Sequence, residues 1–260
     1  MPDRSHHNGM SAARAAEPPR AVPPSIAVLR SASLSSAAQH EIERMILEGE
    51  ITAGTKLTEA WLSERLGVSR GPIREAFRML EEAGLVRQEK NRGVFVREIP
   101  LEEALEIFDL RAAMDEVVGR RLAETMTAEQ MKAARAIVEQ MDIAARGGDS
   151  DAYHRLNLHF HDALVEFAGN RKLAGVYRKL VKELALYRRR SVSDQSMLPS
   201  SAAEHRAILK AIASGDGEVA GRAMYEHVTE SKHRVVHGVV AAHLPRAKPV
   251  RAPSARKARG

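Results

Sequence analysis

Leu57–Val96 is the stretch that decides the fold; it reads LTEAWLSERLGVSRGPIREAFRMLEEAGLVRQEKNRGVFV. The pattern predicts a helix, a tight turn, a second helix and then a short hairpin. Gly67 can adopt the positive φ that ends the first helix. Ser69 is a strong candidate for the N-cap of the second helix, and Pro72 falls within its first turn. These signals predict a helix-turn-helix.

The second helix of this stretch has the features of a recognition helix. Arg70 and Arg74 are four residues apart and therefore share one face near its N-terminus. Arginine in that position can form bidentate bonds with guanine edges, or can grip phosphates, in the major groove. A helical hairpin with solvated arginines explains the same two residues, and an isolated pair of arginines would favour that alternative. The core-facing positions of this helix are Ile73, Ala76, Phe77 and Leu80.

A basic hairpin directly after this helix favours the DNA-binding interpretation. Gly84 closes the helix, and Leu85–Glu89 and Val94–Glu98 have the composition of two short strands around the polar turn Lys90–Gly93. A hairpin with basic residues and glycine is typical of a wing, which contacts phosphates or the minor groove. The whole stretch therefore predicts a winged helix-turn-helix. The residues expected to contact DNA are Ser69, Arg70, Arg74, Arg92 and Gly93.

Ser36–Glu98 resembles the DNA-binding domain of the GntR family of transcription factors. The segments that carry the resemblance are ILEGEITAGTKLTE (46–59), LGVSRGPIREAFRMLEEAGLV (66–86) and RGVFV (92–96). The family more often has Thr where this chain has Gly71, so one backbone or hydroxyl contact with DNA can differ. Ala60 stands where some members carry a DNA-contacting Arg, so that contact is expected to be absent.

The composition limits the class of protein. The chain of 260 residues is long enough for two modest domains, and it contains no cysteine, which excludes disulfides and thiolate metal sites. No apolar run approaches the roughly 18 to 20 residues that span a bilayer. The first thirty residues lack the apolar core of a signal peptide. We therefore expect a cytoplasmic protein with no membrane partner.

The net charge of +6 does not by itself indicate a DNA-binding protein. Residues 244–260 carry six Lys or Arg and no acid, so the preceding chain is close to neutral. Affinity for DNA must then come from a local cluster of cations. We expect residues 1–33, which are rich in Ala, Pro, Ser and Arg, and the basic residues 244–260 to be disordered tails.

The rest of the chain predicts a mainly α protein with two domains. Residues 34–99 are expected to form the winged helix-turn-helix of three helices and a hairpin, with its second helix starting at Leu57. Residues 100–243 predict only helices with short connections, which is typical of an antiparallel bundle. Thr127 and Gln130 form a capping-box pattern at the start of one of these helices. The expected helices are 36–48, 101–126, 127–145, 150–168, 172–190, 201–214 and 216–242, with a polar loop at 191–200.

Asn157, His161, His205 and His227 form a candidate metal site. Asn157 and His161 are four residues apart and share the core-facing side of one helix, whereas His159 points the opposite way. His205 and His227 each lie beside the apolar stripe of another helix. Three imidazoles and an amide oxygen inside a bundle would suit Zn²⁺ or Ni²⁺. From spacing alone, an inward-facing histidine more often satisfies a buried hydrogen bond, so both roles remain open.

Residues 101–242 resemble the FCD-type effector domain of the FadR subfamily. The matching segments are DLRAAMDE (109–116), NLHFH (157–161), EHRAILKAIASGD (204–216) and MYEHV (224–228). The ligands of a divalent metal that this resemblance implies are Asn157, His161, His205 and His227. Asn157 replaces the commoner Asp, which removes one negative charge and should weaken metal affinity. Arg111 matches an arginine that lines the effector cavity and can bind a carboxylate, although a helix-surface ion pair with Asp115 is an equal alternative.

The two resemblances imply a bacterial transcriptional regulator, more often a repressor, and not an enzyme. We expect a homodimer that binds a pseudo-palindromic operator of a catabolic operon, because dimeric helix-turn-helix proteins mirror the symmetry of their sites. A small organic acid bound at the metal site would be the effector.

Two other functions remain as alternatives. The first is a regulator whose metal is purely structural. The second is a metal-dependent hydrolase fused to a DNA-binding module. Against the hydrolase, no Asp or Glu can be identified beside the histidines as a general base, and Glu204 is expected to point away from His205.

Overall fold

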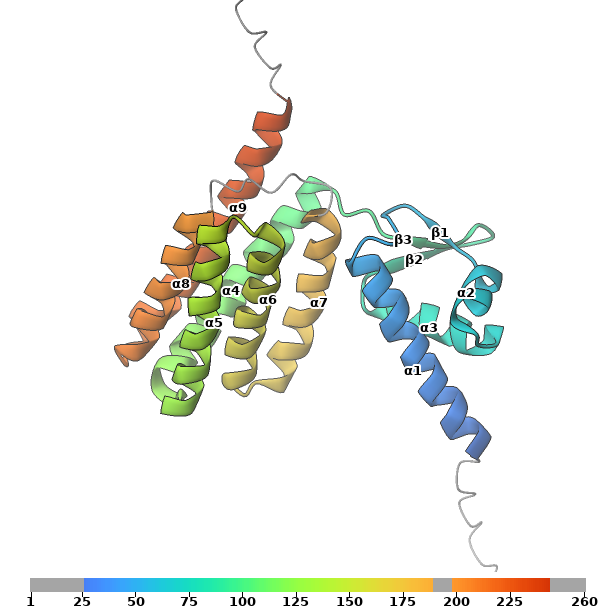
Figure 1. Ribbon diagram of the computed structural model, residues 1–260, viewed down its shortest axis with the longest axis horizontal. Coiled ribbons are helices and arrows are strands. Elements are labelled where there is room, and N and C mark those ends of the chain that lie inside the picture. The colour runs from blue at the N-terminus through green and yellow to red at the C-terminus, as the bar shows by residue number, and fades with distance from the viewer. Residues whose placement is uncertain (1–25, 189–197, 244–260) are drawn as a thin grey trace, which may run out of the picture.

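The computed structural model describes residues 26–188 and 198–243, which form two bodies, the first with a small sheet (Figure 1). The elements of the first body are α1 (Ile26–Leu47), β1 (Lys56–Leu57), α2 (Glu59–Leu66), α3 (Arg70–Glu82), β2 (Val86–Glu89) and β3 (Gly93–Val96). Strand β3 lies at the centre of the sheet, and β1 and β2 pair with it antiparallel on either side. This order of three helices and a hairpin confirms the predicted winged helix-turn-helix.

Local sequence signals explain the turn between α2 and α3. Gly67 adopts φ 66° and donates its backbone N–H to the carbonyl oxygen of Ser63, which ends α2. Ser69 is the N-cap of α3, as predicted, but its hydroxyl accepts no capping hydrogen bond and is not committed to the helix. The residues that α3 buries are Pro72, Ile73, Ala76, Phe77 and Leu80.

The prediction of a disordered N-terminal tail is wrong for part of its range. Helix α1 begins at Ile26, so residues 26–33 are helical. No Pro or Gly follows Pro24 until after the end of α1, and the Ala and Leu residues of this stretch favour a helix. Residues 1–25 and the expected basic tail at 244–260 lie outside the described residues.

The predicted start of the second helix at Leu57 is also wrong. Leu57 lies in β1 and pairs with Val94 of β3. Helix α2 begins only at Glu59, and the side chain of Thr58 caps it by accepting a hydrogen bond from the backbone N–H of Trp61. Strand pairing is a tertiary contact between distant parts of the chain, so the local pattern at Leu57 did not indicate it.

The second body is an all-α bundle in the part of the chain that the structure describes. Its helices are α4 (Leu101–Thr125), α5 (Ala128–Gly147), α6 (Ser150–Phe167), α7 (Arg171–Arg188), α8 (Leu198–Ala213) and α9 (Gly217–His243). The capping box of Thr127 and Gln130 is present at the start of α5. Helix α8 begins at Leu198, inside the stretch expected to be a polar loop, while residues 189–197 lie outside the described ranges.

Helices α4 and α9 form the tightest pair of the bundle. They run antiparallel: Lys232 contacts Asp109 at 2.5 Å at one end, and Arg120 pairs with Glu218 at the other. The two backbones touch between these ends, because a Cβ added at Gly119 would lie 2.6 Å from the carbonyl oxygen of Ala220. Glycine at this position therefore permits the close approach.

Two apolar clusters stabilise the fold, and α4 contributes to both. One contains the core of the winged helix-turn-helix and continues into Phe108 of α4 and Leu184 of α7. The other fills the bundle and includes Val118 and Leu122 of α4. Across residues 26–188 and 198–243, no helix has the length and apolar character needed to cross a bilayer.

Candidate functional site

The N-terminus of α3 presents an open, cationic surface. Ser69, Arg70 and Gly71 are all exposed. A Cβ added at Gly71 would meet no atom within 4 Å, so no packing contact requires glycine there. The absence of a side chain instead lets another backbone approach the start of the helix closely. The predicted contact residues Ser69 and Arg70 are therefore accessible at the start of the helix.

Arg74 lies one turn further along α3, and its orientation is set by Glu59 of α2. Its Nε donates to Oε1 of Glu59 and its Nη2 donates to Oε2, both at 2.9 Å. The side chain of Arg74 is nonetheless 71% exposed. The bidentate contact uses one edge of the guanidinium and leaves Nη1, with the outer hydrogen of Nη2, for another partner. The sequence did not indicate a role for Glu59, which contacts Arg74 only because α2 packs against α3.

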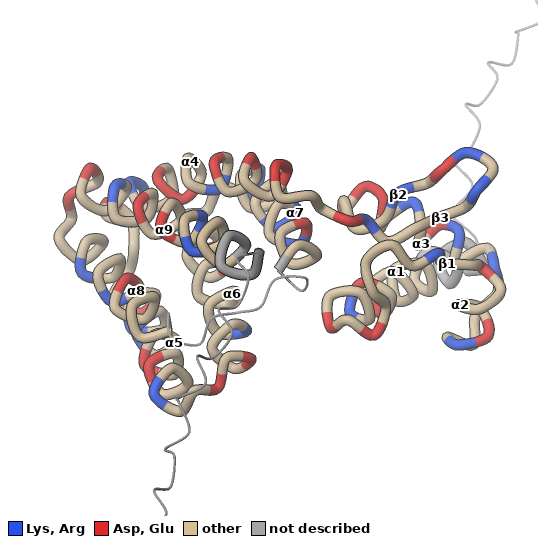
Figure 2. The backbone as a smooth tube through the Cα atoms, turned by 90° about the horizontal axis from the view of Figure 1, so that it is seen from above, with Lys and Arg blue, Asp and Glu red and all other residues tan. Residues whose placement is uncertain are grey.

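The wing brings together more basic residues than the sequence predicted to contact DNA (Figure 2). Arg92 is exposed and pairs with Glu89, and Gly93 adopts φ 110° in the turn. The guanidinium of Arg92 lies 5.7 Å from the centre of the Phe95 ring. The two other cations near this ring, at 5.9 and 5.7 Å, are those of Lys56 and Arg87.

Sequence reasoning missed both of these residues. Lys56 and Arg87 face Phe95 because the register of the sheet places each directly opposite it. The strand β1, which carries Lys56, was not predicted.

The three candidate histidines converge inside the bundle. His161 of α6, His205 of α8 and His227 of α9 each offer a ring nitrogen, and these nitrogens lie within 4.8 Å of one another. The side chains are 4%, 0% and 5% exposed. Nε2 of His161 lies 3.1 Å from Nε2 of His227. The sequence therefore predicted the convergence of these three residues correctly.

Each Nδ1 atom of the triad faces an oxygen, which leaves the Nε2 atoms for a common ligand. Nδ1 of His205 lies 2.6 Å from the carbonyl oxygen of Ser201. Nδ1 of His227 lies 2.7 Å from Oε2 of Glu204. Nδ1 of His161 lies 3.5 Å from Oδ1 of Asp115. In His205 and His227 a hydrogen-bonded oxygen on Nδ1 fixes the tautomer and orients Nε2, as is usual for histidines that bind metal, whereas the contact of His161 with Asp115 is longer than these two hydrogen bonds.

The donor set fits a divalent metal. Nε2 of His205 is buried and has no hydrogen-bond partner within the described ranges. Such atoms are rare in folded proteins, and an unpaired nitrogen of this kind can bind a ligand. Burial, with the nearby His227 and His161, lowers the pKa of His205 well below its ordinary value. The imidazole therefore stays neutral, which is the form that binds Zn²⁺ or Ni²⁺.

Two carboxylates that the sequence did not identify beside the histidines, those of Glu204 and Asp115, lie next to them in the structure. The carboxylate of Glu204 contacts His227, and Arg234 donates to it at 2.6 and 3.0 Å. Burial opposes ionisation of Glu204, but the hydrogen bonds from His227 and Arg234 lower its pKa to about 2. A carboxylate of such low basicity, already bonded to Nδ1, orients the imidazole and is a poor general base.

Arg111 is buried, so the alternative of a helix-surface ion pair is wrong. Its Nη2 donates to the hydroxyl of Tyr177 at 2.7 Å and lies 3.8 Å from Oδ2 of Asp115. Both side chains of the pair are buried, at 6% and 0% exposure. Burial raises the pKa of Asp115 to about 6, against the attraction of Arg111. Asp115 thus links Arg111 to His161, a connection that the sequence did not indicate.

Asn157 lies one helical turn before His161 on α6 and is half-buried. Its position on the same face as His161 agrees with the predicted spacing. Its side-chain amide has no hydrogen-bond partner among the residues whose placement is described, so its oxygen is available to an ion. The structure brings the three histidines together directly, and Asn157 lies one turn from His161 on the same helix.

Comparison with known proteins decides the family. Residues 34–96 match the bacterial regulatory proteins of the gntR family, and residues 106–230 match the FCD domain. A Paenarthrobacter nicotinovorans protein named "Probable D-xylose utilization operon transcriptional repressor" is 30% identical over 200 residues, which are 77% of this chain and 88% of that protein. The chain belongs to the GntR family. It is a GntR-family transcriptional regulator with an FCD domain.

Other proteins are similar to this chain over most of its length. The transcriptional repressor RspR of Escherichia coli K12 is 29% identical over 194 residues, 75% of this chain and 85% of RspR. The structure of E. coli McbR/YncC superposes with a TM-score of 0.68 at 18% identity, covering 78% of this chain and 97% of that one. A GntR regulator from Rhodococcus sp. RHA1 gives 0.67 at 24% identity, with 79% and 98% covered. These two structures support the fold alone.

Proposed function

We propose that this GntR regulator is a homodimeric repressor of a catabolic operon, released from its operator by a small carboxylate bound at a metal site. The observation that carries the proposal is the buried triad of His161, His205 and His227 with every Nδ1 atom facing an oxygen. A ligand bound between the three imidazoles would explain why their Nε2 atoms converge inside the helical domain.

DNA binding is assigned to α3 and the wing. Arg70 and Arg74 would enter the major groove of a half-site, with the hydroxyl of Ser69 and the open surface at Gly71 against the backbone. Arg92 and Gly93 of the wing would contact phosphates or the adjacent minor groove. Two copies of the chain would read a pseudo-palindromic operator.

The effector site follows from charge. Three neutral imidazoles and the neutral amide of Asn157 leave the full charge of a divalent ion uncompensated, so a carboxylate is the favoured ligand. Arg111 supports the same assignment, because its Nε is buried with no hydrogen-bond partner in the described part of the chain. A carboxylate that reached Arg111 would meet both the guanidinium and the metal.

Helix α4 supplies the connection between the two domains. It carries Arg111 and Asp115 at the histidine centre, and only four residues separate it from the end of β3. Its Phe108 belongs to the apolar cluster shared with the DNA-binding domain. A displacement of α4 on effector binding would therefore reach α3, and a coupling of about 1–3 kcal/mol suffices for regulation.

Metal content and operator binding test the proposal. Elemental analysis of the purified protein should find about one divalent ion per chain, and His205→Ala should lose it while operator binding of the metal-free protein persists. His159→Ala is the matched control, because His159 lies on α6 but is exposed. Unchanged metal in His205→Ala would refute the site. Melting curves with a chelator and with small organic acids separate an effector site from a structural metal, which would respond to the chelator alone.

A further inference from the structure

The outer face of the three-stranded sheet gathers three cations around one aromatic ring. Strand β3 lies between β1 and β2, and its Phe95 pairs directly with Lys56 on one side and with Arg87 on the other. Residues that lie directly opposite each other in a sheet place their side chains on the same face. With Arg92 of the turn, this face holds three positive charges at 5.7 to 5.9 Å from the centre of the ring. Because like charges repel, such a cluster is typical of a surface that binds an anion.

The alternation of side chains along the strands keeps these cations in solvent. Leu57, Val86 and Val96 face the core and are 2%, 1% and 0% exposed. Their neighbours Lys56 and Arg87 point to the other side and are exposed. The position of the cations is therefore fixed by the packing of the sheet.

The two guanidiniums of this face share one carboxylate. Oε1 of Glu89 lies 2.9 Å from Nη2 of Arg87, and Oε2 of Glu89 contacts Nη1 of Arg92. Lys56 pairs with no acid among the residues that the structure describes, so its ammonium is free to bind a ligand. Three cations against one carboxylate leave two positive charges uncompensated.

The ammonium of Lys56 lies beside the turn of the wing, although β1 is not part of the hairpin. A Cβ added at Gly93 would lie 3.1 Å from Cε and 3.9 Å from Nζ of Lys56. The absence of a side chain at Gly93 thus gives the lysine stem room to cross the strand. Lys56 can therefore reach the same segment of DNA that Arg92 and Gly93 are expected to contact.

We propose that the outer face of the sheet is a phosphate anchor for DNA, in which Lys56 is the primary contact and Glu89 competes with phosphate for Arg87 and Arg92. The inference rests on the proposed DNA-binding function and adds to it a contact from β1, a strand that precedes the helix-turn-helix. Lys56 binds a phosphate without displacing an acid, whereas each arginine exchanges Glu89 for it. Phe95 is a positioning residue, because the face of an aromatic ring attracts cations.

Continuity with the wing argues for the DNA backbone as the occupant. The anchor includes Arg92, which the wing already presents to DNA, and it lies on the domain that matches the gntR family. A lysine ammonium binds phosphate as a point charge and needs no fixed geometry. The contact therefore carries no sequence information and should act on any duplex.

The salt dependence of DNA binding tests the anchor. The probe is a fluorescently labelled duplex of arbitrary sequence, which the full-length protein binds at several NaCl concentrations. Lys56→Ala should reduce the slope of log K against log salt by about 0.9 for each bound chain, the value for one phosphate contact. Lys56→Arg keeps the charge and should retain the slope. A slope in Lys56→Ala equal to that of wild type would overturn the anchor.

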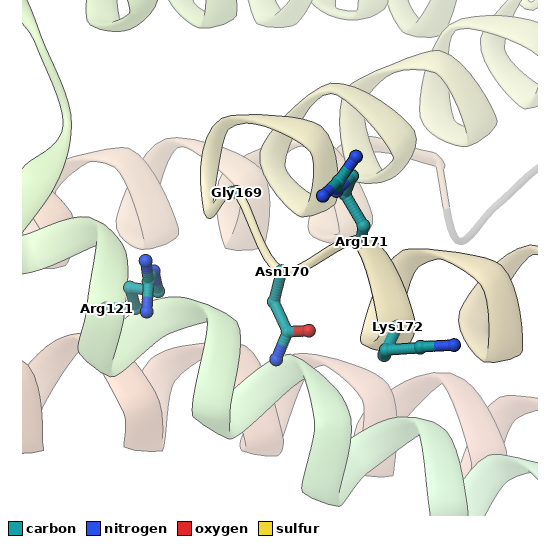
Figure 3. A pocket seen from close by; sticks show the side chains of 5 residues that line it. All are labelled: Arg121, Gly169, Asn170, Arg171 and Lys172. Atoms are coloured by element: carbon teal, nitrogen blue, oxygen red, sulfur yellow. The ribbon is translucent and has the colours of Figure 1, made fainter.

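A cationic surface on the helical domain provides the matched control. A hollow at the turn between α6 and α7 is lined by three cations and no acid (Figure 3). Its residues are Arg121, Gly169, Asn170, Arg171 and Lys172. Lys172→Ala removes the same charge as Lys56→Ala and should leave the slope unchanged. An equal fall in both variants would show an effect of net charge and would also overturn the anchor.

Glu89→Gln tests the competing carboxylate. This change should lower the dissociation constant for the same duplex by roughly 2- to 5-fold, the equivalent of one exposed ion pair. Glu139→Gln removes an exposed acid from α5 and should change nothing. Arg87→Ala should weaken binding more in Glu89→Gln than in wild type, because the arginine no longer has an acid to leave. Circular dichroism checks that each variant is folded.

The outcomes separate the anchor from the function on which it rests. Equal losses from Arg87→Ala with and without Glu89 would overturn the competition. A wild-type protein that binds no duplex would overturn the proposed DNA binding itself, whereas an unchanged slope in Lys56→Ala leaves that function intact and removes only the anchor.

Discussion

At the scale of single residues, the contact between Glu59 and Arg74 sets how the recognition helix presents its guanidinium. An exposed ion pair contributes only about 0–1 kcal/mol to stability, so orientation is its main consequence. With Nε and one Nη2 hydrogen bonded to Glu59, the remaining fork of Nη1 and Nη2 points away from α2. A fork of this kind matches O6 and N7 of a guanine.

We expect Glu59→Gln to lower the preference for operator over non-operator DNA by roughly 5- to 30-fold, within the range for one bidentate base contact. Affinity for non-operator DNA should rise, because a negative charge near the phosphates is removed. Fluorescence anisotropy with both DNAs at one salt concentration measures the ratio. Glu82→Gln makes the same charge change at the far end of α3 and is the control. An unchanged ratio in Glu59→Gln would mean that Arg74 needs no positioning.

Arg70 and Arg92 should behave differently from each other. Arg70→Ala should weaken operator binding by about 1–3 kcal/mol with loss of base preference at one position of each half-site. Arg92→Ala should weaken binding to all sequences alike and reduce the salt dependence, because a wing contact to phosphate carries no sequence information. Competition with operator variants at two salt concentrations distinguishes the two patterns. Equal loss on every operator variant in Arg70→Ala would move Arg70 to the phosphate contacts.

At the scale of elements, the structural features set by neighbouring residues could be predicted from the sequence, whereas those set by tertiary packing could not. Gly67 ends α2 and Thr127 caps α5 as the sequence indicated, because each depends on atoms within four residues. Asp115 was considered only as a surface partner of Arg111, since the spacing of four residues is all that one helix reveals. Its burial beside His161 depends on how α4 packs against α6, which no local pattern encodes.

The close pairing of α4 and α9 should be sensitive to a single methyl group. Gly119→Ala would push a Cβ against the carbonyl of Ala220, and overpacking of this kind lowers the free energy of unfolding by about 1–3 kcal/mol. Gly175→Ala in α7 is the matched control: no atom lies within 4 Å of the added Cβ, so helix propensity should raise stability by about 0.5–1 kcal/mol. Urea unfolding measures both. If Gly119→Ala and wild type had equal free energies of unfolding, α4 and α9 could move apart without loss of stability.

At the scale of the whole molecule, the DNA-binding domain is fixed to the bundle by a buried junction. The apolar cluster is continuous from the core of the winged helix-turn-helix to Leu184 of α7. Ion pairs flank it: Lys182 contacts Glu43 of α1 at 2.6 Å, and Arg97 lies 3.5 Å from Glu183. Because apolar and charged contacts act at the same place, the angle between the domains is determined by packing rather than by a loose hinge.

Glu183 makes this junction sensitive to pH. The residue is 7% exposed, and a Cβ at Gly84 would overlap its carboxylate. Burial raises the pKa of Glu183 above its ordinary 4.5, although Arg97 opposes the shift. The folded protein therefore binds this proton more tightly than the unfolded chain, and the carboxylate lowers stability once it is ionised.

The sign of the effect gives a specific prediction. As the pH falls from neutral, wild type should gain stability relative to Glu183→Gln. The gain begins at the raised pKa of Glu183 in the folded protein. It is complete below about 4.5, where this residue is also protonated in the unfolded chain. Urea unfolding at several pH values gives the difference between the two proteins. Glu166→Gln, which removes an exposed carboxylate on α6, is the control. If wild type instead loses stability relative to Glu183→Gln on acidification, Arg97 outweighs burial and the pair, once ionised, holds the domains together.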